Sequence, residues 1–508
     1  PPFLPFWKPD MDPKKGSPEP MEPNIHSLPQ HLRERTRIAR SRDANAPAAG
    51  PVVYWMRSAL RGHENPALDV AMCMASTLEA ALVVVLHVED RYPNATARRQ
   101  LFLLEGARSA QAELYVRGVS NLIVQVDRRQ RRFGVADLVA LRPSLLVAEE
   151  PFCVPWLSGV EELRNSQLGC SSWLVDAASV VPSALVPPGA CHRAWAYEKA
   201  SQQLHNERTA RPWPEEMAPA VKLEELPASL DLATADLHAL LQETDVDPSV
   251  PPVQHTPGGS AAGYARWNAW LAGGGLKTYA KRRNDSLDIQ GVSRMSGYLN
   301  AGMVSPMRIA REASASSGAG KGKFLNEFLT WRGLSYAWCY HFPMPSTGAT
   351  LAQLPSWARE TLQKHAGDQR KTFAQQALML GSSGDRAWDG MQRYLVETGE
   401  LHNNARMGWG KAVARWAPSP QMAIEMLVTL NNRFALDGHA PPSYGGLLGC
   451  LGLFEGPKQE AAILGRVSFK PPKARYAAMA GLAKQLLMAS HAAIDAADDC
   501  EDSLAESR

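Results

Sequence analysis

Short apolar runs alternate with longer amphipathic segments between residues 51 and 181. The runs are rich in β-branched residues and lack polar alternation: PVVYWM (51–56), ALVVVLHV (81–88), SNLIVQV (120–126), SLLVAEE (144–150) and SWLVDAASVV (172–181). Continuous apolar strands of this kind are typical of a parallel sheet that is buried on both faces. The intervening segments ALDVAMCMASTLEAA and RRQLFLLEGARSAQAELYVRG have helical composition and would cover the sheet. The pattern predicts a doubly wound α/β domain over residues 49–185.

The remaining sequence divides into four segments. Residues 1–48 lack hydrophobic periodicity and are predicted to be a disordered tail, with Arg33–Arg42 as a solvated arm, an organellar presequence remnant or a nuclear-type basic patch. Residues 186–262 are Pro-rich and predict a linker with one helix-like patch, DLATADLHALLQ. Residues 263–455 read as a series of Trp-rich helices, which predicts an all-α domain. Residues 456–508 form a C-terminal extension with an acidic tail.

Composition and charge exclude several classes of protein. The 54 Lys and Arg residues nearly balance 51 Asp and Glu residues, which excludes a histone-like protein that coats nucleic acid by bulk charge. Seven scattered cysteines without a C-x-x-C pair argue against a disulfide framework and against a thiolate metal site. They favour an intracellular, reducing compartment, with a nucleus or an organelle left open. The sequence has no membrane-spanning apolar run, and a monomer is expected.

Familiar nucleotide and metal motifs are missing from the sequence. It contains no G-x-G-x-x-G, no P-loop and no H-E-x-x-H, and the run SGAGKGK (317–323) lacks the spacing of a phosphate-binding loop. The α/β region offers no catalytic constellation. The chemistry is therefore expected in the helical region.

Five ordered runs in that region carry a resemblance. They are GVSRMSGYLNAGMVSPMRIAREA (291–313), FLNEFLTWRGL (324–334), LPSWARETLQKHAGDQR (354–370), ELHNNARMGWGKAVARW (400–416) and LNNRFALDGHAPPSYGG (430–446). The sequence from 51 to 455 resembles the photolyase/cryptochrome family, and most closely the class II cyclobutane pyrimidine dimer DNA photolyases. The resemblance implies a Rossmann-like N-terminal domain that holds an antenna chromophore, a folate or a deazaflavin left open, and a helical domain with bent, non-covalent FAD.

The resemblance also assigns residues to the flavin. Tyr279 and the turn Ser293, Arg294, Met295 and Ser296 would hold the phosphates, beside the basic Lys281 and Arg282. Arg332 would be a second phosphate or flavin contact, and His402 and Asn403 would lie along the isoalloxazine. Arg406 and Asp437 would form an ion pair that stabilises negative charge on the reduced ring. Without the resemblance, such residues would be ordinary caps and solvated salt bridges.

Three tryptophans match the family's photoreduction chain. The resemblance places Trp409 beside the flavin, Trp388 in the middle and Trp416 at the surface. Trp409 and Trp416 are seven positions apart, two helical turns on one face. On pattern alone, tryptophans on a helical stripe would be core residues.

The lesion site departs from the family pattern. Glu327 matches a carboxylic acid that hydrogen-bonds the dimer, Trp331 matches one wall of the dimer pocket, and Met391 matches a residue lining the flavin–lesion cavity. The second wall, usually Trp, is Gly449, and an Asn beside the flavin is replaced by Pro442. Candidate phosphate contacts for DNA are Lys281, Lys364, Lys411 and Arg415.

Three functions follow as alternatives. The first is light-driven repair of UV-damaged DNA containing pyrimidine dimers, by a deoxyribodipyrimidine photo-lyase. The second is a cryptochrome-like blue-light photoreceptor that has lost repair and signals through its tails. The third is a flavoprotein with a redox role in the dark. Glu327 and Trp331 favour repair, whereas Gly449 and Pro442 favour the photoreceptor.

Overall fold

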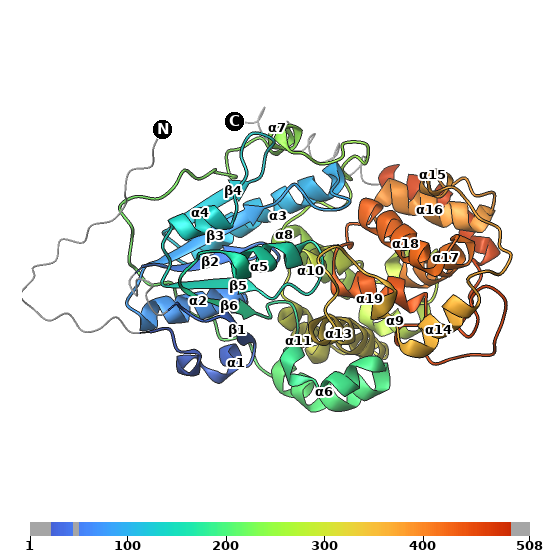
Figure 1. Cartoon of the computed structure of the whole chain (residues 1–508), viewed down its shortest axis with the longest axis horizontal. Coiled ribbons are helices and arrows are strands. Elements are labelled where there is room, and N and C mark those ends of the chain that lie inside the picture. Colours follow the sequence, from blue (N-terminus) through green and yellow to red (C-terminus); the bar gives the residue numbers. More distant parts are fainter. Residues whose placement is uncertain (1–21, 44–49, 489–508) are drawn as a thin grey trace, which may run out of the picture.

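The computed structural model describes residues 22–43 and 50–488, and Figure 1 shows an α/β layer packed beside a larger group of helices. The sheet has six strands in the order β1-β6-β5-β2-β3-β4. β2 to β6 run parallel, and β1 pairs antiparallel with β6. The strands are β1 (Thr36–Arg40), β2 (Val52–Met56), β3 (Leu82–Val88), β4 (Leu122–Val126), β5 (Leu145–Glu149) and β6 (Ser171–Val175).

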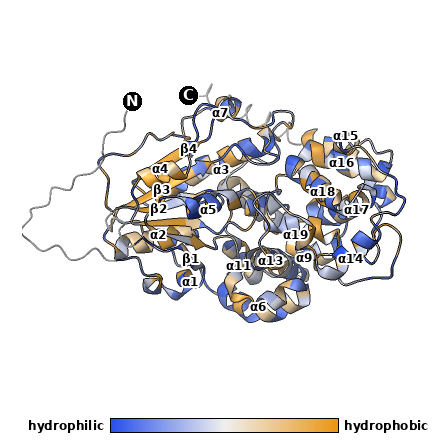
Figure 2. Cartoon of the chain, viewed as in Figure 1, coloured by the Kyte–Doolittle hydropathy of each residue, from blue (hydrophilic) through white to orange (hydrophobic). Residues whose placement is uncertain are grey.

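Helices cover both faces of this sheet. α2 (Pro66–Thr77) and α3 (Ala97–Val116) pack on one face, and α4 (Val135–Ala140) and α5 (Trp156–Asn165) pack on the other. Every residue of β2 to β5 is buried, which explains why the sequence shows apolar runs without alternation. In Figure 2 these strands stand out as a hydrophobic centre between the two helical layers. The predicted doubly wound α/β architecture is confirmed.

The prediction of a disordered tail through residue 48 is wrong for residues 22–43. This segment forms η1 (Ile25–Ser27), α1 (Gln30–Arg33) and β1. Its arginines are used inside the fold: the Arg35 guanidinium donates to the carbonyls of Ser179 and Val180 at 2.6 and 2.7 Å, and Arg37 binds Glu150 through two nitrogens. Arg33–Arg42 is therefore an edge of the sheet rather than a free basic arm. The rest of the predicted tail lies outside the described residues.

The segment predicted as a linker contains more helix than its sequence suggested. α7 (Leu237–Glu243) falls in the predicted patch, but α6 (Ala194–Thr209) was not expected. α6 has only three buried residues, among them Tyr197, so its sequence carries little amphipathic signal. Two short turns, η2 (Ser183–Leu185) and η3 (Pro188–His192), lead into it.

The remaining chain up to residue 449 is mainly helical, as predicted. Its elements are α8 (Ser260–Ala272), α9 (Gly275–Arg282), η4 (Ile289–Gly291), α10 (Ser296–Asn300), α11 (Pro306–Ala315), α12 (Lys321–Leu325), the π-helical segment η5 (Asn326–Arg332), α13 (Gly333–His341), η6 (Leu351–Gln353), α14 (Ser356–Lys364), α15 (Gln375–Met379), α16 (Arg386–Thr398), α17 (Asn403–Trp416), α18 (Pro420–Phe434) and α19 (Pro441–Gly449). Ser419 caps α18, and Pro420 occupies the first position of the helix.

The C-terminal extension is partly ordered against the helical half. Its element η7 (Ala474–Ala478) packs on α16, where Tyr476 is buried. Gly390 of α16 allows this approach, because a Cβ there would lie 2.5 Å from the carbonyl oxygen of Tyr476. The acidic tail itself lies outside the described residues.

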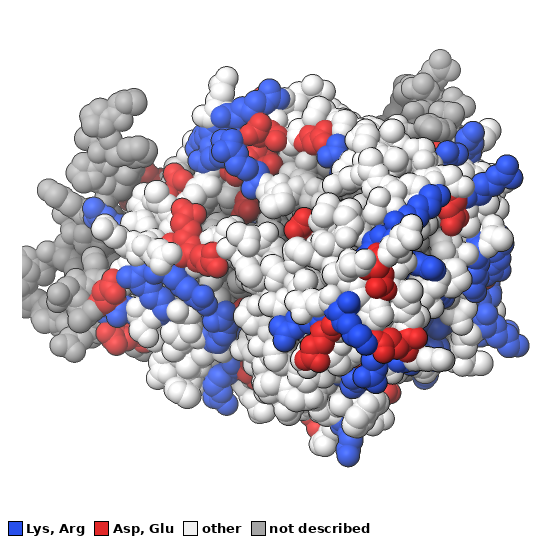
Figure 3. Space-filling model, turned by 45° about the vertical axis from the view of Figure 1, so that its right-hand side comes forward, with Lys and Arg blue, Asp and Glu red and all other residues white. Residues whose placement is uncertain are grey.

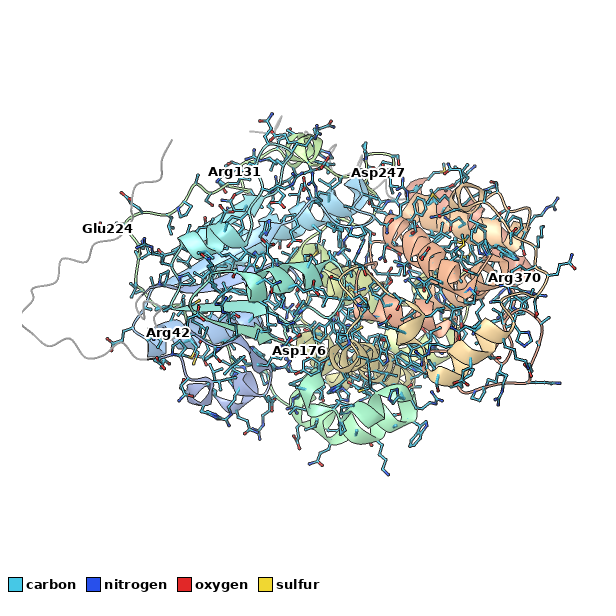
Figure 4. The ribbon with its side chains drawn as sticks, in the orientation of Figure 1. Arg42, Arg131, Asp176, Glu224, Asp247 and Arg370 are labelled. Carbon is cyan, nitrogen blue, oxygen red and sulfur yellow. The ribbon has the colours of Figure 1, made fainter. Side chains whose placement is uncertain are left out.

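Buried arginines hold the two halves together. Arg98 of α3 donates to the carbonyls of Val396 and Phe434, at 2.6 and 3.0 Å, across the junction. Arg332 donates to the carbonyl of Ala178 at 2.8 Å. Figure 4 places Asp176 at this junction, where its carboxylate accepts the amide hydrogens of Ala178 and Ser179 and orients the turn.

Two further expectations bear on the molecule as a whole. In the part of the chain that the structure describes, no helix combines the length and apolarity needed to cross a bilayer. The six cysteines within that part are all free thiols, consistent with the absence of a disulfide framework.

Candidate functional site

A cavity of about 640 Å³ opens in the helical half, and most of the predicted residues line it. Its walls come from α9, the turn before α10, the stretch α12–η5, the start of α17 and α19. A second hollow of about 880 Å³ lies between α3, α7 and residues 244–257, and it is lined largely by prolines and aliphatic side chains. None of the predicted site residues lines that hollow, so the first cavity is the candidate site.

The predicted phosphate turn forms one wall of the cavity. Ser293, Arg294, Met295 and Ser296 all line it, and Arg294 has a left-handed backbone with φ of 53°. The Arg294 side chain binds Glu400 through two nitrogens, at 2.6 and 3.0 Å. Burial alone would raise the pKa of Glu400, but the charge of Arg294, with contributions from neighbouring basic groups, lowers it well below the usual range. Glu400 is therefore ionised.

The basic residue beside Tyr279 is not the one expected from the sequence. Tyr279 lines the cavity and is nearly buried, and burial raises its pKa. Lys281 and Arg282 do not line the cavity, and Arg282 binds Asp288 at 2.6 Å instead. Arg283, the C-cap of α9, faces the cavity in their place. Because residues four apart lie on the same side of an α-helix, position 283 lies on the same side as Tyr279.

His402 lines the cavity and has one ring nitrogen with a partner and one without among the described residues. It is the N-cap of α17, and its Nδ1 accepts the backbone N–H of Asn404 at 3.1 Å. Burial lowers the pKa of His402 to about 4, so the ring is neutral near pH 7 and its proton resides on Nε2. Nε2 is buried, and no atom of residues 22–43 or 50–488 forms a hydrogen bond with it. The neighbouring Asn403 is exposed and also lines the cavity.

The predicted ion pair is present. Arg406 Nη2 lies 2.8 Å from Asp437 Oδ1, and both side chains are largely buried. Arg332 also lines the cavity, but its Nη atoms bind Ala178 and Tyr336. The Nε atoms of Arg332 and Arg406 are buried without a partner. With His402 Nε2, they are three orphaned donors on residues that line one cavity.

The cavity carries an excess of positive charge. The cations on its wall are Arg266, Arg283, Arg294, Lys323, Arg332 and Arg406. The acids on its wall are Asp288, Glu327, Glu400, Asp437 and Glu455, but Asp288 pairs with Arg282 and Glu455 with Lys411, both outside the lining. Six cations thus face three available carboxylates. This balance suits a ligand with two or three negative charges, such as a dinucleotide pyrophosphate.

The three predicted tryptophans form a continuous ladder. Trp388 stacks on Trp409 with ring centroids 6.2 Å apart and planes 6° apart, and it meets Trp416 edge-on at 5.5 Å. Trp388 Nε1 donates to the carbonyl of Trp409, and Trp409 Nε1 donates to Gln392. Trp388 and Trp409 are fully buried, whereas Trp416 is half-buried. The inner end is Trp409, on the helix whose Arg406 and Met407 line the cavity.

The predicted lesion residues also meet in the cavity. Glu327 and Trp331 lie about one turn apart on η5, and Trp331 is 42% exposed. Gly449 and Pro442 of α19 line the same cavity. A Cβ built on Gly449 meets no atom within 4 Å, so the missing second wall leaves open space rather than a filled pocket.

Two sequence-based assignments are wrong. Met391 does not line the cavity; it is fully buried in the core between α16 and its neighbours. Met407 lines the cavity instead and was missed, although its place two residues before Trp409 in the run RMGW put it beside the inner end of the ladder. Lys411 is also buried, and its ammonium binds Ser468, so it cannot contact a DNA phosphate.

Several known proteins are similar to this chain in sequence. The family model described as DNA photolyase matches residues 52–142. A deoxyribodipyrimidine photo-lyase of Methanothermobacter thermautotrophicus is 28% identical over 436 residues, which cover 82% of this chain and 90% of that protein. One from Arabidopsis thaliana is 27% identical over 83% of this chain and 85% of its own.

Solved structures show the same fold at lower identity. A class III photolyase from Agrobacterium tumefaciens has a TM-score of 0.59 at 15% identity, covering 87% of each chain. A Synechocystis cryptochrome has a TM-score of 0.61 at 16% identity, covering 88% of this chain and 89% of its own.

Proposed function

Because the chain belongs to the photolyase/cryptochrome family, we propose that it is a light-dependent FAD protein that repairs cyclobutane pyrimidine dimers in UV-damaged DNA. Within the family we propose the class II subgroup. The tryptophan ladder that runs from the cavity side of α17 to the half-buried Trp416 is the observation that carries the proposal. A stacked, nearly parallel indole pair buried behind a cavity-lining helix suits stepwise electron transfer to a cofactor in that cavity.

The cavity fits FAD on observations of its own. Three residues that line it have a buried donor without a partner among the described residues: His402 Nε2, Arg332 Nε and Arg406 Nε. The cationic excess would offset the pyrophosphate, with Tyr279 and the turn at Ser293–Ser296 as the residues that hold it. When bound and reduced, FAD supplies a light-excited electron donor. Arg406, held in place by Asp437, would be the residue whose guanidinium stabilises negative charge on the reduced flavin.

The same cavity would hold the flipped-out dimer. Trp331 offers an exposed indole face for stacking, and Glu327 offers a carboxylate to the lesion. Figure 3 shows Lys and Arg side chains spread over the helical half, a surface that suits the DNA backbone. Lys364 pairs with Glu460 and Arg415 lies over Phe469, yet Lys364 and Arg415 are exposed and remain candidates, with Lys281.

A cryptochrome-like photoreceptor is the second candidate. Gly449 and Pro442 stand where repair enzymes of the family carry Trp and Asn, so stacking on one side of the lesion is lost. Repair keeps one structural feature in its favour, because no side chain of the described residues fills the side of the cavity next to Gly449. An antenna chromophore and a monomeric state remain predictions.

The deciding experiment compares light and dark. Purified, chemically reduced protein is mixed with a thymine-dimer oligonucleotide, and dimer loss is measured under blue or near-UV light and in darkness. The proposal predicts loss in light only. Absence of loss in both, together with light-dependent protease sensitivity of the chain ends, would favour the photoreceptor.

A further inference from the structure

Three cavity-lining residues follow one another on a single helical stretch. Lys323 lies on α12, Glu327 lies about one turn later on η5, and Trp331 follows after another turn. The two outer members are the most open, with Lys323 at 40% side-chain exposure and Trp331 at 42%. A π-helical segment within an α-helical run is frequently found at functional sites. The lysine thus belongs to the same face as the two residues proposed to meet the lesion.

Two cations share one oxygen of Glu327. Lys323 Nζ lies 2.6 Å from Glu327 Oε1, and Arg283 Nη2 lies 2.8 Å from the same atom. The cluster therefore has one positive charge more than its single carboxylate can neutralise. Glu327 Oε1 already accepts from both cations, so this oxygen does not serve as a donor to a lesion carbonyl.

Of the two cations, Lys323 is the more exposed, and its ammonium also donates to Asn326 Oδ1 at 3.2 Å. Arg283 is only 17% exposed and lies near the ring of Tyr279, with 5.9 Å from Cζ to the ring centroid. Lys323 is more exposed and has a flexible four-carbon chain, and a solvent-accessible ion pair of this kind contributes little. If Lys323 leaves, Arg283 still pairs with Glu327, so no carboxylate is left uncompensated.

We propose that Lys323 is a catalytic residue, whose ammonium leaves Glu327 and hydrogen-bonds a carbonyl oxygen of the pyrimidine dimer. This inference rests on the proposed repair function. One electron, which the light-excited reduced flavin of the proposed function would supply, enters the dimer, and the two carbon–carbon bonds that join the pyrimidines break. The electron would then return to the flavin, so no net oxidation occurs. While the electron is present, negative charge resides on the pyrimidine carbonyl oxygens. The Lys323 ammonium stabilises that charge through its hydrogen bond to the carbonyl oxygen.

The experiment uses the full-length protein with its flavin, chemically reduced beforehand. Lys323→Met removes the charge, Lys323→Arg retains it, and Lys321→Met is the control. Lys321 lies on the same helix, but its ammonium binds the carbonyl of Ser314 at 3.2 Å and it does not line the cavity. Flavin content, affinity for dimer-containing DNA in the dark and dimers repaired per absorbed photon are measured for each.

We expect Lys323→Met to lower the repair yield per photon about three- to tenfold, because one charge-assisted contact to the charged intermediate is lost. Flavin content should stay at the wild-type level, and Lys323→Arg and Lys321→Met should repair normally. An unchanged yield in Lys323→Met overturns the role of Lys323, and so does a loss of flavin, which would assign the lysine to the cofactor. No light-driven repair by the flavin-loaded wild type would instead overturn the proposed function.

Discussion

At the scale of single residues, the site depends on how individual polar atoms are satisfied. His402 shows this most clearly, because one ring nitrogen is committed to capping α17 and the other is left for a ligand. Glu400 shows the opposite arrangement, with its charge neutralised by Arg294 and Arg266 inside the wall of the cavity. The cavity wall therefore contains a neutral imidazole at His402 and, apart from it, a charged cluster of Glu400 with Arg294 and Arg266.

The lowered pKa of His402 predicts a dependence of stability on pH. The folded-state pKa of about 4 lies below the ordinary value of 6.5, so protonation favours the unfolded chain. His402 therefore contributes fully above pH 6.5, and its contribution falls as pH drops from 6.5 to 4, by about 3 kcal/mol in all. His402→Asn keeps an N-cap but does not titrate. Urea unfolding at pH 7 and pH 4.5 should show a smaller acid-induced loss in the variant; equal losses would contradict the assignment.

Gly449 predicts a gain of function at the same scale. Because a Cβ at this position meets no atom within 4 Å, Gly449→Trp should restore a second stacking wall without a clash at its base. Binding to dimer-containing DNA should tighten by about 1–3 kcal/mol, ten- to a hundredfold, with little change on undamaged DNA.

The control for this variant is Gly445→Ala, one turn earlier on α19. A Cβ at Gly445 would lie 2.5 Å from Ser335 Oγ, so that variant should lose stability and gain no affinity. Equal affinities of Gly449→Trp and wild type for dimer DNA would show that the lesion does not reach α19.

At the scale of elements, α16 and α17 are placed so that three indoles meet. Trp388 of α16 lies between Trp409 and Trp416 of α17, which are two turns apart on their own helix. The resemblance supplied the order of the three, and the structure supplies the contacts. Sequence spacing alone could place Trp409 and Trp416 on one face but could not reveal that a ring from another helix lies between them.

Interrupting this ladder should block loading of the electron but not repair itself. Trp388→Phe, with no readily oxidised ring at the middle position, should slow photoreduction of the oxidised flavin by at least about tenfold, because each hop depends steeply on separation. Chemically reduced Trp388→Phe protein should repair dimers as the wild type does. Trp195→Phe, an exposed position on α6, is the control. If the oxidised flavin of Trp388→Phe is photoreduced at the wild-type rate, the three tryptophans do not carry the electron.

The buried strands of the sheet were predictable from the sequence, but its edge strand was not. β2 to β5 were predictable because residues buried on both faces read as uninterrupted apolar runs. β1 was not, because it is a partly exposed edge strand, in which Arg37 binds Glu150, while Arg35 just before it binds carbonyls. Met391 was misplaced for a related reason: the pattern marks it as buried but does not say which helix face meets the cavity.

At the scale of the whole molecule, the α/β and helical halves are joined by buried guanidinium groups. Arg98 is 3% exposed and donates to four carbonyls, those of Pro251, Leu395, Val396 and Phe434. Burial lowers its pKa to about 10, so it remains charged at neutral pH. A residue on α3 is thereby bound to the ends of α16 and α18, next to the helices that frame the cavity.

Removing this link should uncouple the two halves. Arg98→Met should destabilise the protein by about 3 kcal/mol, since it leaves buried carbonyls without donors, and should split thermal unfolding into two transitions. Arg108→Met is the matched control, because Arg108 lies on the same helix but binds only the carbonyls of Leu232 and Ala235. A single, unshifted transition in Arg98→Met would mean that the junction is held elsewhere.

The FAD content of the purified protein tests most directly whether the cavity of the helical half holds one FAD. The full-length protein is purified without added cofactor, its visible absorbance is recorded, and FAD released by denaturation is quantified. Arg406→Leu, which breaks the pair with Asp437 at the cavity wall, is measured in parallel against Arg415→Leu, an exposed position on the same helix. We expect about one FAD per chain in the wild type and in Arg415→Leu, and a marked loss of FAD in Arg406→Leu. A wild-type protein with no flavin absorbance that releases no FAD would contradict the account.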